Sequence, residues 1–149
     1  MSSEENAATA RRWYTEGWTG NFAMADDIFA PNIAINGNIV GPAGPKRNCA
    51  NRLTGFPDLQ VVIEEQVIAD DKIVTRARWS GTHTGPYRGI APPGKHVAVR
   101  DMSIWRFVDG RSVENWTVMD ELGLMQQLGV LPPGVGNFQV PADSAETAK

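Results

Sequence analysis

One hairpin constrains the fold of this chain more than any other feature. Residues 97–107 (VAVRDMSIWRF) and 112–120 (SVENWTVMD) are rich in β-branched and aromatic side chains, and Asp109-Gly110 lies between them. A two-residue type I′ turn requires positive φ at both central positions, and Asp-Gly tolerates that conformation well. The sequence therefore predicts two long antiparallel strands joined at this turn.

Two carboxylates fall within the predicted hairpin. Uninterrupted pairing back from the turn puts Asp101 opposite Val118, with Asp120 as its diagonal neighbour, about 7 to 8 Å away at the backbone. Trp105 and Trp116 then share that face. Carboxylates beside apolar rings tend to have raised pKa values, which suits proton transfer near neutral pH. The opposite face is equally mixed in polarity, so alternation does not say which face is inside, and a bulge would reverse the assignment.

Length and charge favour one ordinary globular domain. We expect a single domain over residues 1–131 and an extended or disordered tail over 132–149. The formal charge of −3 gives no electrostatic footprint for nucleic acid or an anionic membrane. No run of about 18 apolar residues occurs and the start MSSEEN is polar, so a cytoplasmic protein is expected. The single cysteine, Cys49, excludes an internal disulfide and offers no metal cluster.

The order of elements predicts an α+β fold. Helices are expected over residues 7–17, 22–30, 45–55 and 121–129, from apolar side chains at helical spacing and from capping and breaking residues. Strands are expected over residues 33–36, 59–68, 72–80, 97–107 and 112–120. A Pro- and Gly-rich loop, residues 85–94, precedes the hairpin and has the composition of a cavity rim. Helices followed by consecutive hairpins favour a curved sheet wrapped over helices.

Several motifs in the second half of the chain resemble the SnoaL-like polyketide cyclase family. GTHTG from residue 81, GIAPPG from residue 89 and RFVDG from residue 106 match its turn, loop and strand-end patterns. ENWTVMD followed by LMQQLG matches its Glu-x-Trp-x-x-x-Asp pattern and terminal helix. The N-terminal half agrees more loosely, through WYTEGWTGNFAMADDIFAPN and GFPDL.

The resemblance implies a nuclear-transport-factor-2-like α+β barrel, a cone-shaped curved antiparallel or mixed sheet that encloses an apolar cavity with the N-terminal helices. It implies a cyclase without cofactor or metal that closes a ring of an anthraquinone-type polyketide ester by intramolecular aldol condensation. The aspartate after Glu-x-Trp-x-x-x is the family's acid/base, which corresponds to Asp120 here. His83 and Asn36 are candidate hydrogen-bond donors to the alkoxide formed.

The resemblance implies a small hydrophobic aromatic substrate, and neither nucleic acid nor a membrane is expected as a partner. It also implies a homodimer or homotetramer that assembles through the outer face of the sheet. The chain departs from the family pattern at three positions. Many members have His at the position of Asn36 and Gly at the position of Asp101. His is also frequent in the family at the position of Asn115. An additional Asp would change the charge of the cavity and suit a different reaction. The expected substrate-binding residues are Trp116, Asp101, Trp105, Trp79, Asn36 and Tyr14.

Each functional interpretation has a structural alternative. Asp120 directly precedes a predicted helix and is a good N-cap, Asp101 can pair with an arginine, and His83 can be a turn residue bonded to backbone. An epoxide hydrolase or hydroxylase on the same fold is a second enzyme class, although Arg100 and Asp101 point to opposite faces of a regular strand. The third alternative is a non-catalytic domain that binds a small hydrophobic ligand.

Overall fold

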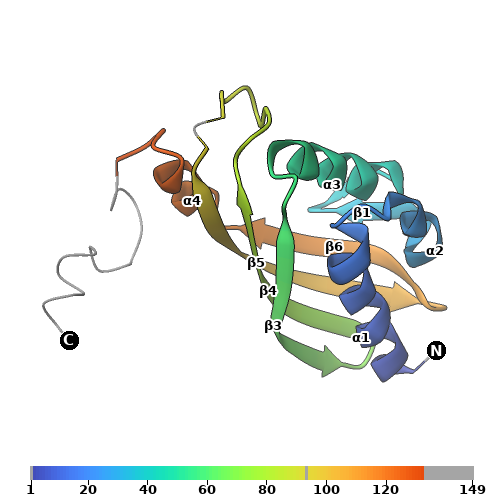
Figure 1. The fold of residues 1–149 in the computed structure, drawn as a ribbon. Helices are drawn as coiled ribbons and strands as arrows, with labels where there is room; N and C mark the ends of the chain where they lie inside the picture. The colour runs from blue at the N-terminus through green and yellow to red at the C-terminus, as the bar shows by residue number, and fades with distance from the viewer. Residues whose placement is uncertain (1, 93, 133–149) are drawn as a thin grey trace, which may run out of the picture.

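A computed structural model describes residues 2–92 and 94–132 and shows an open, curved, six-stranded sheet packed against helices (Figure 1). The strands are β1 Phe29–Ile35, β2 Asn38–Ile39, β3 Gln60–Ala69, β4 Lys72–Thr82, β5 His96–Val108 and β6 Arg111–Met119. Their order is β2-β1-β6-β5-β4-β3; β1 runs parallel to β6, and the other neighbours are antiparallel. The expected α+β class is confirmed. Apart from Pro132, the expected tail lies outside the described residues.

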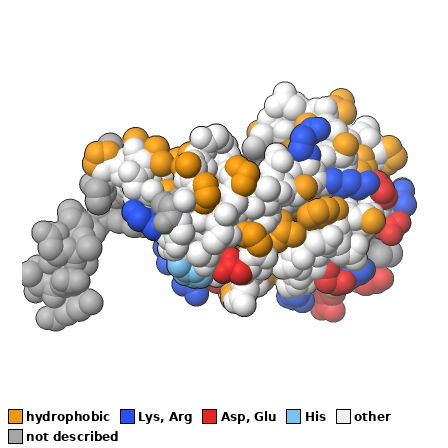
Figure 2. Space-filling view, turned by 45° about the horizontal axis from the view of Figure 1, so that its top comes forward, with side chains coloured by type: hydrophobic (Ala, Val, Ile, Leu, Met, Phe, Trp, Pro, Cys, Tyr) orange, Lys and Arg blue, Asp and Glu red, His pale blue; other side chains and the backbone are white. Residues whose placement is uncertain are grey.

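The helices are α1 Ser3–Arg12, α2 Ala25–Ile28, α3 Ala43–Gly55 and α4 Glu121–Gln127. In Figure 1, α1 lies across the sheet, α3 lies along its upper side, and α4 lies at the end away from the N-terminus. Within the described residues, no helix is both long and apolar enough to cross a membrane. Positive and negative side chains lie interspersed on the face shown in Figure 2, without a broad field of one sign.

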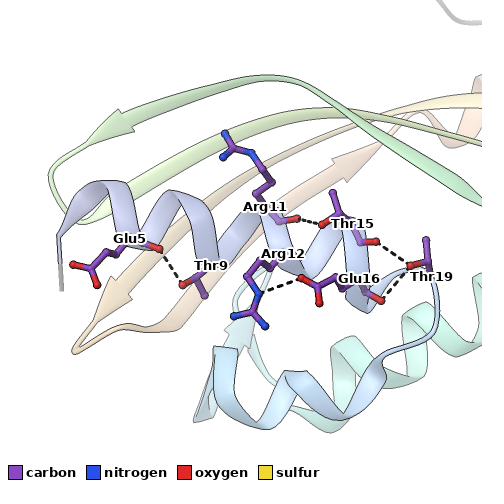
Figure 3. A network of polar contacts seen from close by, with 7 residues as sticks. All are labelled: Glu5, Thr9, Arg11, Arg12, Thr15, Glu16 and Thr19. Atoms are coloured by element: carbon purple, nitrogen blue, oxygen red, sulfur yellow. Dashed lines mark hydrogen bonds and ion pairs between the residues drawn. The ribbon is translucent and has the colours of Figure 1, made fainter.

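The helical segment that begins with α1 has a polar outer side and a buried inner side. Thr9, Thr15 and Thr19 each donate a hydrogen bond to a backbone carbonyl one turn earlier on the outer side (Figure 3). After α1 the chain continues through a π-helical turn, Trp13–Gly17, which buries the first two side chains of that turn. A π turn shifts the helical phase by one residue. Tyr14 is therefore directed into the interior.

The central hairpin confirms the predicted turn and overturns the predicted register beyond it. Asp109 and Gly110 have φ of 50° and 80°, and Val108 lies opposite Arg111. A β-bulge then interrupts the pairing, because Phe107 is opposite Ser112 but Arg106 is opposite Glu114, which leaves Val113 as the extra residue. Asp101 consequently lies opposite Met119 rather than the expected Val118.

The bulge changes which side chains of β6 face the interior. Ser112 and Asn115 are both buried, and the Ser112 hydroxyl donates to Asn115 Oδ1 at 2.5 Å. Trp116 and Val118 are instead 49% and 71% exposed on the outer face. The expectation that Trp116 shares a face with Asp101 is wrong, because the extra residue reverses the alternation of β6 beyond the turn.

The inner face of β5 forms the middle of the core. Its inward side chains are Val97, Val99, Asp101, Ser103, Trp105 and Phe107, all buried. The Trp105 ring stacks on Phe29 with centroids 5.3 Å apart, and lies 6.2 Å from the ring of Tyr14. Two polar residues thus lie in the middle of an otherwise apolar strand face, and they mark the functional region.

Candidate functional site

A cavity of about 740 Å³ opens between α3, residues 86–88, the middle of β5, the C-terminal end of β6 and the start of α4. We call it the outer cavity. A smaller space of about 80 Å³, the inner chamber, is lined mainly by aromatic and apolar side chains of the π-helical turn, β1 and β5. The residues that line both spaces are Asn48, Arg52, Asp101 and Thr117. A carboxylate and a guanidinium therefore lie where a polar entrance meets an apolar end.

Asp101 is the buried carboxylate of this site. Its side chain is only 4% exposed, and β4 and β6 flank it with Ala77 and Met119. Burial raises the pKa of Asp101 to about 6, although the positive charge of Arg52 and a hydrogen bond from Tyr14 oppose the rise. A carboxyl group with a pKa near 6 exchanges protons readily near neutral pH, as a general acid or base must.

A chain of hydrogen bonds ends on this carboxylate. The Trp105 indole donates to Ser103 Oγ at 2.9 Å, and the hydroxyls of Ser103 and Tyr14 are 2.6 Å apart. The Tyr14 hydroxyl donates to Asp101 Oδ1 at 3.3 Å. Because each hydroxyl has one proton, the Ser103 hydroxyl must donate to Tyr14 when Tyr14 donates to Asp101. All donors in the chain thus point toward the carboxylate and favour its ionised form.

Arg52 supplies the positive charge of the site from the last turn of α3. Its Cζ lies 3.8 Å from the centroid of the Trp18 ring, which is a cation–π contact. One N–H donates weakly to the Cys49 Sγ at 3.9 Å, and the buried Nε has no hydrogen-bond partner among the described residues. Burial raises the pKa of the Cys49 thiol to about 11, despite the opposing charge of Arg52. The thiol therefore stays protonated and is a poor nucleophile.

Four of the residues predicted from the sequence line these spaces. Tyr14 and Trp105 line the inner chamber, Asp101 lines both spaces, and Asn36 lines the outer cavity. The Asn36 side chain donates to the Thr117 carbonyl at 3.1 Å and accepts from the Thr117 amide at 2.9 Å. Asn36 therefore ties the end of β1 to β6 and holds the cavity wall.

Asp120 is an exposed residue between β6 and α4. Its Oδ1 accepts a hydrogen bond from the Gly123 amide at 2.9 Å, so its side chain caps the N-terminus of α4. A methyl group on Gly123 would lie 2.2 Å from Asp120 Oδ2, so the glycine keeps room for this cap. The carboxylate points to the backbone in this arrangement, and its role as acid/base stays a prediction.

His83 and Trp79 lie in an aromatic cluster with Phe56 and Tyr87, and neither is itself among the residues that line the outer cavity or the inner chamber. The His83 ring is fully buried and stacks on Phe56 with centroids 5.1 Å apart. Neither of its ring nitrogens has a hydrogen-bond partner within the described part of the chain. The Trp79 indole contacts Met119 Sδ at 3.4 Å. Their roles in catalysis and substrate binding stay predictions.

A family model described as SnoaL-like polyketide cyclase matches residues 8–128. The chain belongs to the SnoaL-like polyketide cyclase family. Comparison with curated proteins found no match.

Solved structures agree with the SnoaL-like assignment. AclR from Streptomyces galilaeus, described as a candidate hydroxylase, is 27% identical with a TM-score of 0.80, covering 99% of this chain and 91% of that one. A candidate SnoaL-like polyketide cyclase from Jannaschia sp. CCS1 is 28% identical with a TM-score of 0.76, covering 87% and 94%. IdmH from Streptomyces antibioticus, a candidate polyketide cyclase, is 25% identical with a TM-score of 0.74, covering 84% and 99%.

Sequence reasoning missed the contribution of α3 to this SnoaL-like site. Asn48 and Arg52 are one helical turn apart, and both line the two spaces. Their polar spacing was a usable signal, since the same helix buries Pro45 and Cys49 on the adjoining stripe. Asn115, a departure from the family pattern, was not expected to face the inner chamber, because the bulge that turns it inward was not predicted. Within residues 2–92 and 94–132, no group of three or more His, Cys, Asp or Glu is arranged to hold a metal ion.

Proposed function

We propose that this SnoaL-like protein is a cofactor-free polyketide cyclase in which Asp101 is the acid/base. The observation that carries the proposal is a buried carboxylate with a pKa raised to about 6, where a polar cavity meets an aromatic chamber. The outer cavity, of about 740 Å³, has room for an anthraquinone-type ring system, and its polar lining matches the ester and ketone oxygens of such a substrate. The similarity to polyketide cyclases supports this class of substrate.

The reaction is an intramolecular aldol closure, and its atoms balance without a cofactor. Ionised Asp101 removes a proton from the carbon between an ester and an aryl ketone, and the charge delocalises over the resulting enolate. The enolate carbon attacks a ketone carbon of the same molecule, so that a C–C bond forms and the C=O π bond breaks. Protonated Asp101 then returns its proton to the alkoxide. The product is an isomer of the substrate, and the carboxylate is regenerated.

Asp120 is the competing candidate for the base. The resemblance to the family implies Asp120 as the acid/base, whereas the buried setting and raised pKa favour Asp101. The deciding assay measures ring closure of methyl esters of anthraquinone acids by wild type, Asp101→Asn and Asp120→Asn, with folding checked by circular dichroism. We expect a loss of about 10²-fold or more in Asp101→Asn, the scale of a positioned general base, and a much smaller loss in Asp120→Asn. The reverse order of losses would assign the base to Asp120.

A hydroxylase-like or epoxide hydrolase-like reaction is the second candidate function. Similarity to AclR over nearly the whole chain favours it, as does the placement of Arg52 near Asp101 in one cavity wall. In that case the carboxylate would activate a water molecule rather than a carbon acid. Turnover of epoxides by wild type, with no ring closure of the anthraquinone esters, would favour this function. Tight binding of aromatic ligands with neither reaction would indicate the non-catalytic ligand-binding domain.

A further inference from the structure

The guanidinium of Arg52 is a strong donor group that the protein itself hardly uses. Arginine has five N–H donors in a planar fork. Among the described residues its side chain makes one hydrogen bond, the 3.9 Å contact with Cys49 Sγ. A partly buried charged donor with unmet hydrogen-bonding capacity costs free energy. The arrangement is therefore one that a ligand completes.

The protein holds this donor group against aromatic rings. The guanidinium lies 3.8 Å from the ring centroid of Trp18 and 5.9 Å from that of Trp79. A cation–π contact with an aromatic face favours this position of the guanidinium over others in the cavity. Because Arg52 lines both the outer cavity and the inner chamber, the free part of the fork faces ligand space.

The positive charge of Arg52 is not neutralised by a direct ion pair with the neighbouring carboxylate of Asp101. It lowers the pKa of Asp101 at a distance, yet the two side chains form no ion pair within 4.0 Å among the contacts of the described residues. A purely structural arginine at this position would pair directly with the carboxylate, because a buried charge is stabilised most by a hydrogen-bonded partner. Both groups line the same two spaces, so each is placed to contact a ligand on its own.

We propose that Arg52 binds a 1,3-dicarbonyl unit of the substrate, with both oxygens of its enolate accepting hydrogen bonds from the guanidinium fork. The inference rests on the proposed function and specifies its substrate as a β-keto ester or β-diketone. A 1,3-dicarbonyl enolate is planar, and its two oxygens share one negative charge, so it matches a planar bidentate donor as a carboxylate does. A single ketone offers one oxygen and no shared charge.

The net charge of the site stays the same when a proton moves from the substrate to Asp101. Before proton transfer the site holds ionised Asp101, Arg52 and a neutral substrate. After the transfer it holds neutral Asp101, Arg52 and an enolate anion. The negative charge moves from one neighbour of Arg52 to another, so the guanidinium stabilises the enolate without an additional buried charge. Arg52 would then touch the substrate and be a catalytic residue.

Binding of a ligand that cannot close a ring tests the inference. The probe is benzoylacetone, whose enolate and neutral forms differ in ultraviolet absorption, and the matched control ligand is 4-phenylbutan-2-one, which has one carbonyl. The proteins are wild type, Arg52→Gln and Arg52→Lys, each checked for folding by circular dichroism. The quantity compared is the affinity for the benzoylacetone enolate divided by the affinity for the monoketone.

We expect this ratio to fall about 10- to 100-fold in Arg52→Gln, the range for hydrogen bonds to a charged group. It should fall less in Arg52→Lys, which keeps the charge and the stem over Trp18 but loses the fork. Arg52→Lys also provides the test if the glutamine variant does not fold. Asp101→Asn should bind the enolate more tightly than wild type, because it lacks the competing negative charge.

An unchanged ratio in both arginine variants would overturn the inference, and so would an equal loss of affinity for both ligands, which indicates a general effect on the cavity. The outcome is separable from that of the proposed function. Ring closure by wild type without a role for Arg52 in enolate binding would refute the inference alone. Arg52-dependent binding of the enolate by a protein that closes no ring would refute the cyclase reaction and support the binding site.

Discussion

The Tyr14 hydroxyl donates a hydrogen bond to Asp101 Oδ1 at 3.3 Å, and both side chains are buried. This contact joins the π-helical turn after α1 to the middle of β5, at positions 87 residues apart in the chain. The bond is long, so it offsets only part of the cost of burying a charge, and the pKa of Asp101 is still raised to about 6. Tyr14 therefore adjusts the pH at which Asp101 becomes a base.

Replacement of Tyr14 by Phe should shift the pH dependence of activity. The hydrogen bond from Tyr14 lowers the pKa of Asp101, so its removal raises that pKa further. We expect the rise of kcat/KM with pH, which lies near pH 6 in wild type, to move up by about one unit. Tyr87→Phe removes a hydroxyl from a tyrosine that lines the outer cavity instead of the inner chamber, and it should leave the inflection in place. If the inflection of kcat/KM with pH is unchanged in Tyr14→Phe, the activity does not depend on the ionisation of Asp101.

The stability of the protein should fall as Asp101 ionises. Its folded-state pKa is raised from the ordinary value of 3.8 to about 6, so between these values the folded state binds more protons than the unfolded state. Stability is then greatest below the ordinary pKa and is lost as pH rises through about 6. The contribution is on the order of 3 kcal/mol in the free energy of unfolding.

Urea unfolding of wild type and Asp101→Asn over a series of pH values checks this linkage. The asparagine variant lacks the titrating group, so it should lose this part of the pH dependence and be the more stable protein at neutral pH. A wild-type protein whose stability rises through pH 6 relative to the variant would contradict the raised pKa of Asp101.

The capping role of Asp120 can be separated from a chemical role by two substitutions. Asp120→Ala removes the acceptor for the Gly123 amide and should lower the free energy of unfolding by about 1 kcal/mol. Asp120→Ser keeps a capping oxygen and removes the carboxylate, so it should retain both stability and most of the activity. Thermal melts and the ring-closure assay measure the two effects. A stable but inactive serine variant would show that the carboxylate takes part in the chemistry.

The outer face of the sheet should form a contact between two copies of the chain. Ile104 lies opposite Trp116 and Met102 opposite Val118, and all four are at least 43% exposed, so they form one apolar patch. The Arg106–Glu114 ion pair adjoins it. We expect a homodimer or homotetramer, with Trp116→Glu giving the mass of one 16.2 kDa chain by light scattering.

Val130→Glu is the matched control for this substitution, since Val130 is equally exposed, at 50%, but follows α4 rather than lying in the sheet. It should leave the assembly intact. A monomeric wild type at micromolar concentration would rule out the predicted assembly through this face.

The parts of the fold that local physics determines were predictable from the sequence. The Asp109-Gly110 turn follows from the positive φ that both residues adopt, and the α+β class follows from the order of helical and alternating patterns. The alternation of β5 is uninterrupted over the strand, so the sets of residues that share a face were predictable, although which set is buried was not. The inward position of Asp101 could not be predicted, because both faces of the hairpin are mixed in polarity.

The parts that depend on tertiary packing were not predictable. The bulge at Val113 is accompanied by the Ser112–Asn115 hydrogen bond within β6 and by the Arg106–Glu114 ion pair between β5 and β6, which no local pattern reveals. It reversed the face assigned to Trp116. The meeting of Arg52 with Asp101 depends on how α3 packs over the sheet, and no spacing along the chain gives that geometry.

Hydrogen–deuterium exchange at the acidic carbon of a substrate analogue tests the central claim most directly. The analogue keeps the carbon between the ester and the aryl ketone but lacks the ketone that is attacked, so only proton removal is observed by NMR. Exchange catalysed by wild type should be lost about 10²-fold or more in Asp101→Asn and largely kept in Asp120→Ser. Exchange that persists in a folded Asp101→Asn protein would contradict the assignment of Asp101 as the base.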